Sequence, residues 1–474
     1  MISWKLILFT VYQVVVIMTI IHVVMDNRQP AKTMAWALVI WFIPVVGIVF
    51  YLFFGINTRK ERLVSQRSMD QLSKRSMLEF VEQKNLQLPE DYKAVIDLLV
   101  NENFSLPFQN NHVRIYTDGY SFFPALLREI AAAKEHIHID MYIIADDPLG
   151  YLVADALIDK ARQGVEVKVI YDDVGCWNVR HSFFERMREE GIEVVPFLPV
   201  RFPSFTSKVN YRNHRKLIVI DGRTGFIGGM NIALRYVKGT EPQPWRDTML
   251  QITGSGVYGL QRAFLVDWYF VDRTQISDRK YYPKSTEPIS NTTLIQTVTS
   301  GPVTPYPEIM QGMVRVILAA KRYLYIETPY FLPTEPVLFA LKTAALGGVD
   351  VRLMVPLRSD AKFVEWASRS YLREVVNTGV RVSFYKAGFL HSKVIVSDDA
   401  ICSCGSTNID FRSFENNFEA NLFIYDKKVA EEMRDMFLAD EAESILFTDI
   451  PNRVHPRFMK RLGESVVRML SPVM

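Results

Sequence analysis

The segment N-H-R-K-L-I-V-I-D-G-R-T-G-F-I-G-G-M-N at residues 213–231 has a second copy, L-H-S-K-V-I-V-S-D-D-A-I-C-S-C-G-S-T-N, at residues 390–408. Both copies contain a His-x-Lys-x4-Asp pattern followed by Gly and Asn at the same spacing. The matched residues are His214, Lys216, Asp221, Gly228 and Asn231 in the first copy, and His391, Lys393, Asp398, Gly405 and Asn408 in the second. One such match can arise by chance, but two at one spacing predict a single active site divided between two repeats.

Each motif is predicted to lie on a buried strand. Residues 217–220 read Leu-Ile-Val-Ile and residues 394–396 read Val-Ile-Val, aliphatic runs that are typical of such strands. A His and a Lys two positions apart on a strand point to the same face of its sheet. Two such strands brought together would therefore present two imidazoles and two ammonium groups at one place.

This set of groups suits phosphodiester chemistry. One neutral imidazole can attack phosphorus, while the other, as imidazolium, protonates the departing alkoxide. The two lysines would balance the negative charge on the non-bridging oxygens. Such a reaction requires neither a metal nor any other cofactor.

Similarity between the two halves extends beyond the motifs. Residues 132–144 match residues 319–331, and residues 157–171 match residues 341–355 with the pattern of a helix, a glycine and an alternating strand. Strands alternating with helices predict an α/β fold of mixed sheets flanked by helices. We expect two such lobes, at residues 108–290 and 291–474, with their motif strands facing each other across a pseudo-two-fold axis.

The N-terminal region is strongly apolar. Residues 6–25 carry no charge, and about 20 helical residues at about 1.5 Å each span the hydrocarbon of a bilayer. Residues 33–55 are similar, which predicts a two-helix membrane anchor at residues 1–56, followed by a basic, polar linker at residues 57–107. Basic residues are in excess outside the two spans, so both termini and the lobes are expected on the cytoplasmic side.

Bulk properties restrict the function less sharply. A net charge of +3 gives no strong nucleic-acid footprint, and no nucleic-acid partner is expected. The three cysteines, Cys176, Cys402 and Cys404, are too few for a disulfide framework. His136 and His138 alternate on a predicted strand, but no further ligands stand at a convincing spacing, which favours a structural role over a metal site.

The duplicated motif resembles that of the phospholipase D superfamily. Its second copy continues as G-S-T-N-I-D-F-R-S-F-E-N-N-F-E at residues 405–419, which is similar to the extended form in bacterial cardiolipin synthases. Residues 27–55 look like the membrane anchor of that family, and residues 464–474 look like its C-terminus. The resemblance thus covers nearly the whole chain and implies a covalent phosphohistidine intermediate, with catalysis shared between the two His-Lys-Asp sets.

The resemblance also implies roles for residues outside the motifs. Asp247 and Glu419 each follow a motif by about thirty residues, where the family has a carboxylate that hydrogen-bonds the catalytic His and fixes its tautomer. An ion pair with Arg246 or Arg412 is the alternative for these carboxylates.

Two further pairs of motif residues have expected roles. Asn231 and Asn408 are expected to donate hydrogen bonds to the phosphate. Asp221 and Asp398 stand at the ends of the motif strands, where they are expected to hold the framework of the site rather than transfer protons.

Taken with these residues, the resemblance implies a phosphatidyltransferase of a bacterial cell membrane. One phosphatidylglycerol would transfer its phosphatidyl group to a His and release glycerol, and a second phosphatidylglycerol would then attack to give cardiolipin. His214 is the preferred nucleophile and His391 the preferred acid, although the symmetry of the repeats leaves their roles interchangeable. A phospholipase D with water as acceptor is the main alternative. A nuclease is disfavoured by the apolar spans and the weak charge, and a non-catalytic scaffold by the two intact motifs.

Two segments have two interpretations each. Residues 197–205, F-L-P-V-R-F-P-S-F, are typical of a loop that dips into the membrane interface, and an ordinary buried crossover would look similar. Residues 457–474 mix basic and apolar side chains, a pattern that fits an amphipathic helix on the membrane or a helix packed on the second lobe.

Overall fold

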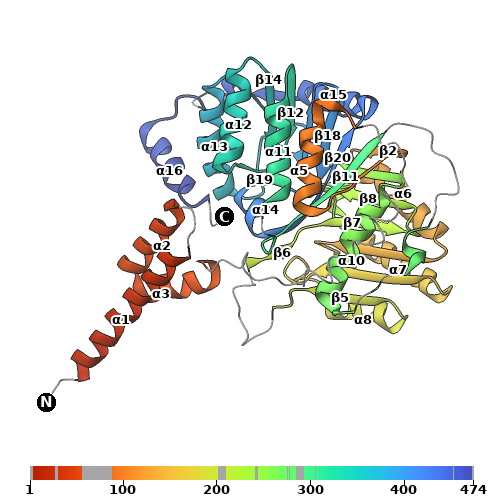
Figure 1. Cartoon of the computed structure of the whole chain (residues 1–474), viewed down its shortest axis with the longest axis horizontal. Coiled ribbons are helices and arrows are strands. Elements are labelled where there is room, and N and C mark those ends of the chain that lie inside the picture. Colours follow the sequence, from red (N-terminus) through yellow and green to blue (C-terminus); the bar gives the residue numbers. More distant parts are fainter. Residues whose placement is uncertain are drawn as a thin grey trace.

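The computed structural model describes residues 4–26, 30–55, 88–200, 210–240, 244–274, 276, 278–283, 293–304, 306–451 and 453–471. A helical N-terminal arm projects from a body in which helices cover two sheets (Figure 1). Residues 57–87 of the predicted linker and residues 201–205 of the predicted interfacial loop lie outside the described residues.

The first lobe is built on a mixed, seven-stranded sheet. Its order is β2-β10-β8-β7-β3-β4-β5, with β3, β4 and β5 parallel and the other neighbours antiparallel. The strands are β2 (Asn111–Tyr116), β3 (His136–Met141), β4 (Glu166–Asp172), β5 (Glu193–Phe197), β7 (Lys216–Ile220), β8 (Thr224–Gly228) and β10 (Met249–Gly254). The helices are α6 (Gly119–Ala132), α7 (Pro148–Arg162), α8 (His181–Glu189), α9 (Arg235–Lys238) and α10 (Val257–Asp272).

The second lobe repeats this arrangement in a ten-stranded sheet. Its main order is β1-β11-β20-β18-β17-β12-β14-β15-β21, and its run from β20 to β15 corresponds to the run from β10 to β5 in the first lobe. The strands are β1 (Pro107–Phe108), β11 (Leu294–Ser300), β12 (Tyr323–Glu327), β14 (Asp350–Pro356), β15 (Arg381–Tyr385), β17 (Val394–Ser397), β18 (Ile401–Gly405), β20 (Asn417–Tyr425) and β21 (Ser444–Leu446). The helices are α11 (Glu308–Ala319), α12 (Glu335–Leu346), α13 (Lys362–Val376), α14 (Phe411–Glu415), α15 (Lys427–Ala442) and α16 (Phe458–Arg468). The predicted fold class is therefore confirmed.

The two motif strands are buried on both faces. In β7, Leu217 and Val219 pack into the core between the lobes, while Ile218 packs on the other side, into the core under α6 and α7. In β17, Val394 and Val396 enter the same central core. A strand buried on both faces requires a continuous aliphatic run rather than strict alternation, as the sequence has at both places.

Two short ladders join the lobes beside the motifs. Strand β6 (Arg212–Asn213), just before the first motif His, pairs with β20 of the second lobe. Strand β9 (Trp245–Arg246) of the first lobe pairs in parallel with β16 (Phe389–Leu390), just before the second motif His. Each motif His therefore lies against a strand of the opposite lobe.

The predicted linker range contains an ordered helix. α5 (Lys93–Asn103) packs on α11, and its side chains Val95, Ile96 and Leu99 are part of the second-lobe core. Figure 1 shows α5 in a row with α11 and α12 over one face of the second sheet. The boundaries predicted for the linker and the lobes stay predictions.

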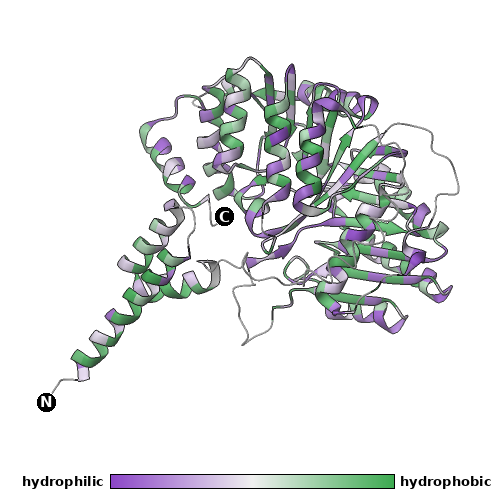
Figure 2. Cartoon of the chain, viewed as in Figure 1, coloured by the Kyte–Doolittle hydropathy of each residue, from purple (hydrophilic) through white to green (hydrophobic). Residues whose placement is uncertain are grey.

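The N-terminal arm consists of α1 (Trp4–Met25), α2 (Pro30–Phe42), α3 (Pro44–Phe50) and a π-helical turn, Tyr51–Gly55. Among the described residues, α1 is the one helix long and apolar enough to cross a membrane. The second apolar segment is divided into α2 and α3: the helix breaks at Ile43, because Pro44 lacks the N–H that would continue it. The rings of Trp36 and Tyr51 lie 5.5 Å apart, so α3 folds back along α2. Figure 2 shows the mostly apolar character of the arm.

Candidate active site

Both motifs open onto one cavity of about 500 Å³ between the lobes. The cavity lies near the carboxyl ends of β3 and β12, one strand from each sheet. Tyr142 and Tyr330, which follow these strands, are among its lining residues. Among the predicted residues, His214, His391, Asn231 and Asn408 line it. The remaining lining residues are Tyr142, Ile143, Arg212, Arg235, Tyr236, Thr240, Trp245, Tyr330, Leu332, Asp360, Val364, Asp410, Arg412 and Asn417.

His214 is held by a carboxylate of the second lobe. Its Nδ1 lies 3.0 Å and 3.1 Å from the two carboxylate oxygens of Glu419. The contact follows from the β6–β20 ladder, in which the backbone N–H of His214 donates to the carbonyl of Phe418, the residue before Glu419. The Nζ of Lys216 donates to the backbone carbonyl of His214 over 2.7 Å.

His391 is held in the same way by the first lobe. Its Nδ1 lies 2.6 Å from Oδ2 of Asp247. The backbone N–H of His391 donates to the carbonyl of Arg246, the residue before Asp247, as the β9–β16 pairing dictates. The Nζ of Lys393 donates to the backbone carbonyl of His391 and lies 3.0 Å from its Nδ1.

The carboxylates thus exchange partners between the lobes. Each follows the motif of its own lobe in sequence but contacts the His of the other. The alternative ion pairs are not formed: Arg246 pairs with Asp440 at 2.8 Å, and Arg412 donates to the carbonyl of Asn210. A carboxylate on Nδ1 places the proton there and leaves Nε2 as the nitrogen available to a substrate.

Burial controls the charge of the site. It lowers the pKa of His214 to about 4, although the charge of Glu419 opposes the shift. It lowers the pKa of His391 to about 3, with the nearby Lys393 acting in the same direction and Asp247 opposing. Burial also lowers the pKa of both lysines. Both imidazoles are therefore neutral near pH 7 in the free protein.

Glu419 and Asp247, the carboxylates that orient the two imidazoles, are ionised near pH 7. Burial by itself would raise the pKa of Glu419, but the attraction of His214 and Lys216 outweighs it, so the pKa of Glu419 lies below its ordinary value. The pKa of Asp247 is also low, because Lys393 and His391 outweigh the same effect of burial. Each imidazole therefore faces a fixed negative charge at Nδ1.

The motif aspartates lie away from the cavity. Asp221 accepts hydrogen bonds from the backbone N–H groups of residues 134, 135 and 136, at 2.8, 2.8 and 2.9 Å, and so caps the start of β3. Asp398 does the same for residues 321, 322 and 323, at the start of β12. Both adopt positive φ angles, of 52° and 57°. These contacts are structural, in line with the framework role expected for them.

The two asparagines differ in their surroundings. Asn231 donates from Nδ2 to the hydroxyl of Tyr236 over 2.5 Å and accepts at Oδ1 from the N–H of Ile143, so its amide is engaged by protein groups. Asn408 is buried, and no hydrogen-bond partner is recorded for its Oδ1. Because Oδ1 is an acceptor, the predicted donation to phosphate would have to come from Nδ2 of Asn408, and this role stays a prediction.

Sequence reasoning missed most of the cavity wall. Three arginines, Arg212, Arg235 and Arg412, bring positive charge to it. Trp245 lies beside the ring of His391 at 5.2 Å, and Tyr142 beside the ring of His214 at 4.9 Å. Arg412 stands in the extended second motif and Trp245 next to Asp247, so proximity in sequence was the signal available for these two.

The two histidines on β3 have structural partners. The Gln261 side chain lies 3.1 Å from Nε2 of His136 and 2.9 Å from Nδ1 of His138, and Phe264 stacks on His138. No cluster of His, Cys, Asp and Glu suited to a metal ion occurs in the described part of the chain.

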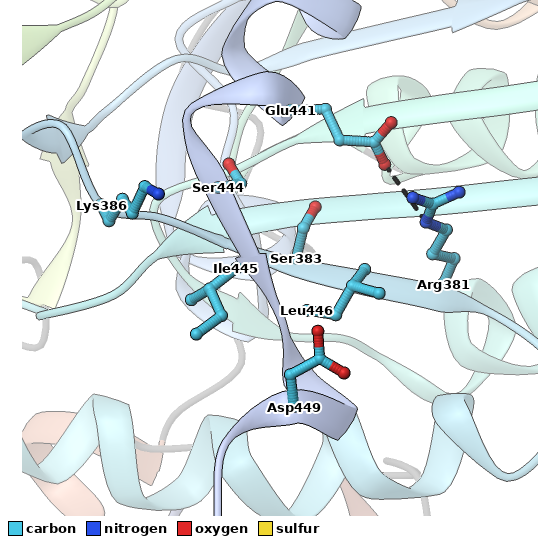
Figure 3. Close-up of a pocket in the computed structure, with 8 residues that line it drawn as sticks. All are labelled: Arg381, Ser383, Lys386, Glu441, Ser444, Ile445, Leu446 and Asp449. Atoms are coloured by element: carbon cyan, nitrogen blue, oxygen red, sulfur yellow. Dashed lines mark ion pairs between the residues drawn. The ribbon is translucent and has the colours of Figure 1, made fainter.

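A second hollow of about 220 Å³ lies at the β15–β21 edge of the second sheet. Figure 3 shows its lining, in which Arg381 faces Glu441 at 3.5 Å and Lys386 stands apart from them. It contains none of the motif residues. The larger cavity is therefore the candidate active site.

Comparison with known proteins identifies the family of the chain. The family model described as "Cardiolipin synthase, PLD-like domain" matches residues 126–243 and 313–440, and "Phospholipase_D-nuclease N-terminal" matches residues 14–55. The chain is similar to "Major cardiolipin synthase ClsA" of Bacillus subtilis (strain 168), with 38% identity over 97% of both chains. A "Cardiolipin synthase" of Alkalihalophilus pseudofirmus is 38% identical, over 100% of this chain and 95% of that protein.

A solved structure supports the fold. The phosphatidylserine synthase of Haemophilus influenzae Rd KW20 superposes with a TM-score of 0.61 at 16% identity, covering 82% of this chain and 100% of that one. At that identity the similarity shows the fold alone. With the near full-length matches, the chain belongs to the bacterial cardiolipin synthases, phosphatidyltransferases of the phospholipase D superfamily. The resemblance inferred from the motifs is thereby confirmed.

Proposed function

We propose that the protein transfers a phosphatidyl group from one phosphatidylglycerol to another, giving cardiolipin and glycerol. The observation that carries the proposal is the pair of neutral imidazoles on one cavity, each held at Nδ1 by a carboxylate of the opposite lobe. In the first half-reaction Nε2 of His214 attacks phosphorus. The bond from phosphorus to the glycerol oxygen breaks, and that oxygen takes the Nε2 proton of His391, which is an imidazolium once the phosphodiester anion occupies the cavity.

The second half-reaction reverses these roles. The neutral His391 takes the proton of the glycerol hydroxyl of the second phosphatidylglycerol, whose oxygen attacks phosphorus. The phosphorus–nitrogen bond to His214 breaks and cardiolipin forms. One phosphodiester is made for each one broken, so the reaction needs no nucleotide. His214 supplies the nucleophile and His391 both proton transfers, without a metal.

The charge of the cavity supports this use of His391. Its pKa is low in the free protein because of burial and the nearby Lys393. A phosphodiester anion in the cavity would favour the imidazolium, and Asp247 would hold that cation in place. The lysines and the cavity arginines are suited to balance the charge on the non-bridging oxygens.

The N-terminal arm supports a membrane location. α1 is long enough to span the hydrocarbon, and both substrates are lipids, so an anchored enzyme meets them at high local concentration. We propose that the arm holds the lobes on the cytoplasmic face of the bacterial membrane, as the excess of basic residues outside the apolar segments favours.

The test is to incubate the detergent-purified protein with labelled phosphatidylglycerol, without metal or nucleotide, and to separate the lipid products by chromatography. Cardiolipin with one glycerol released per turnover supports the transfer. Phosphatidic acid without cardiolipin would mean that water is the acceptor and would overturn the proposal in favour of hydrolysis.

A further inference from the structure

Helix α16 near the C-terminus carries an apolar stripe that is exposed in the part of the chain that the structure describes. Phe458, Met459, Leu462, Val466 and Met469 fall within a sector about 100° wide on a helix of 3.6 residues per turn. Phe458, Met459 and Met469 expose 75, 74 and 79% of their surface, and the other two expose about half. The stripe is thus fully formed and faces away from the lobe.

The opposite, polar face of α16 is the one that docks on the lobe. Glu464 is buried and pairs with Arg373 of α13 at 2.6 Å. Arg468 donates to Glu374 over 2.7 Å and stacks on Tyr371, with 4.0 Å between the guanidinium carbon and the ring centroid. Val467 of α16 is also buried on the lobe, but a surface helix of a soluble domain ordinarily buries most of its apolar side chains, whereas most of those of α16 are exposed.

The stripe continues onto the start of α13. Trp366, which is half exposed, packs beside Gly463 of α16, and Phe363 on the preceding turn is 70% exposed. Asp360 and Val364, from the same stretch of chain, line the catalytic cavity. The apolar surface therefore extends from α16 to the edge of the cavity.

Basic side chains border this surface. Lys460 and Arg461 are exposed on α16, one on each side of the stripe, and Lys362 begins α13. Apolar side chains with cations at their edges match the acyl and headgroup layers of an anionic bilayer. In a two-fold contact between copies of α16 the same cations would approach one another, which disfavours a second copy as the partner.

We propose that the α16–α13 surface, formed by Phe363, Trp366, Phe458, Met459, Leu462 and Val466, inserts into the interface of the bilayer to which α1 anchors the protein. This second contact sets the mouth of the cavity at headgroup depth, so that a phospholipid reaches the two histidines without leaving the membrane. The delivery of substrate rests on the proposed function, whereas the membrane contact does not.

The contact is tested by depth measurement on the full chain. Cys176, Cys402 and Cys404 are buried, so a single exposed cysteine, Met459→Cys or Val466→Cys, can be labelled selectively with a fluorophore. Ser182→Cys, exposed on α8 of the first lobe, is the matched control. In phosphatidylglycerol nanodiscs with nitroxide-bearing acyl chains, labels at 459 and 466 are expected to be quenched and the label at 182 not. Equal quenching at the three positions would overturn the proposal, as would label-to-label contact at 459 without lipid quenching.

A second measurement connects the contact to turnover. Phe458→Ser combined with Leu462→Gln is expected to lower the rate on phosphatidylglycerol vesicles about tenfold and to leave the rate in detergent micelles unchanged. Leu318→Gln with Leu346→Gln is the control, since both side chains are exposed just before the amino ends of β12 and β14, away from the cavity. Equal rates of the two variants on vesicles would count against delivery. If the wild-type protein forms no cardiolipin from phosphatidylglycerol, the proposed function is refuted. The quenching measurement would still test the membrane contact by itself.

Discussion

Because each orienting carboxylate contacts the His of the opposite lobe, Asp247→Asn in the first lobe is predicted to impair His391 of the second. Asparagine keeps the size of the side chain but removes the charge that Nδ1 of His391 faces at 2.6 Å. A buried hydrogen bond to a charged group contributes about 1.5–3 kcal/mol, equivalent to roughly 10- to 100-fold in rate. Loss of tautomer control in comparable His-carboxylate pairs raises the effect to about 10⁴-fold. We therefore expect kcat to fall between about 10- and 10⁴-fold.

The pH profile then separates the two histidines. The charge of Asp247 raises the pKa of His391, so Asp247→Asn lowers it and leaves less imidazolium at every pH. If His391 is the acid, the alkaline limb of kcat moves to lower pH. The charge of Glu419 raises the pKa of His214, which must be neutral to attack, so Glu419→Gln moves the acid limb to lower pH. If instead Asp247→Asn moves the acid limb and Glu419→Gln the alkaline limb, His391 is the nucleophile and His214 the acid.

The assay is cardiolipin formation from labelled phosphatidylglycerol between pH 4 and 9, with the thermal unfolding of each variant as the control for folding. Arg412→Lys serves as a comparison, because Arg412 lines the cavity but contacts neither carboxylate. An Asp247→Asn enzyme within about threefold of wild type, with an unshifted profile, would refute the positioning argument.

Three further predictions concern the motif residues and the absence of a metal step. His214→Ala and His391→Ala should each reduce turnover below detection, and near-normal activity of either would contradict the shared site; of the two, the variant that keeps the nucleophile should still form a labelled phosphohistidine on mass spectrometry. Asp221→Ala should lower the free energy of unfolding by about 2–4 kcal/mol, because three backbone hydrogen bonds at about 1 kcal/mol each are lost and alanine disfavours positive φ; an unchanged midpoint of thermal unfolding would argue against this framework role. Treatment with a chelator should leave kcat unaltered, since His214 provides the nucleophile and His391 both proton transfers; inactivation that added Mg²⁺ or Ca²⁺ reverses would show otherwise.

Much of the fold could be predicted because its signals are local. The aliphatic runs of β7 and β17 predict strands buried on both faces, and the repeated helix-glycine-strand units predict two lobes of one architecture. The His and Lys of each motif lie two residues apart, so their proximity follows from strand geometry alone. The membrane-length α1 likewise depends only on composition and rise per residue.

Other features depended on contacts between distant segments. The sequence placed Asp247 and Glu419 near the motifs, but only the β6–β20 and β9–β16 ladders decide that each contacts the His of the opposite lobe. The fold-back of α3 on α2 after the break at Ile43 likewise depends on contacts between separate segments, such as that of Trp36 with Tyr51. The arginines of the cavity wall come from segments that no local pattern connects.

Helix α16 shows the same division within one element. Its sequence determined that an amphipathic helix forms and which residues share each face, because both follow from 3.6 residues per turn. Which face turns outward was decided by the pairing of Glu464 and Arg468 with α13, more than 90 positions earlier in the chain. Local geometry is encoded residue by residue, whereas the choice between two faces depends on the free energy of contacts that exist only in the folded chain.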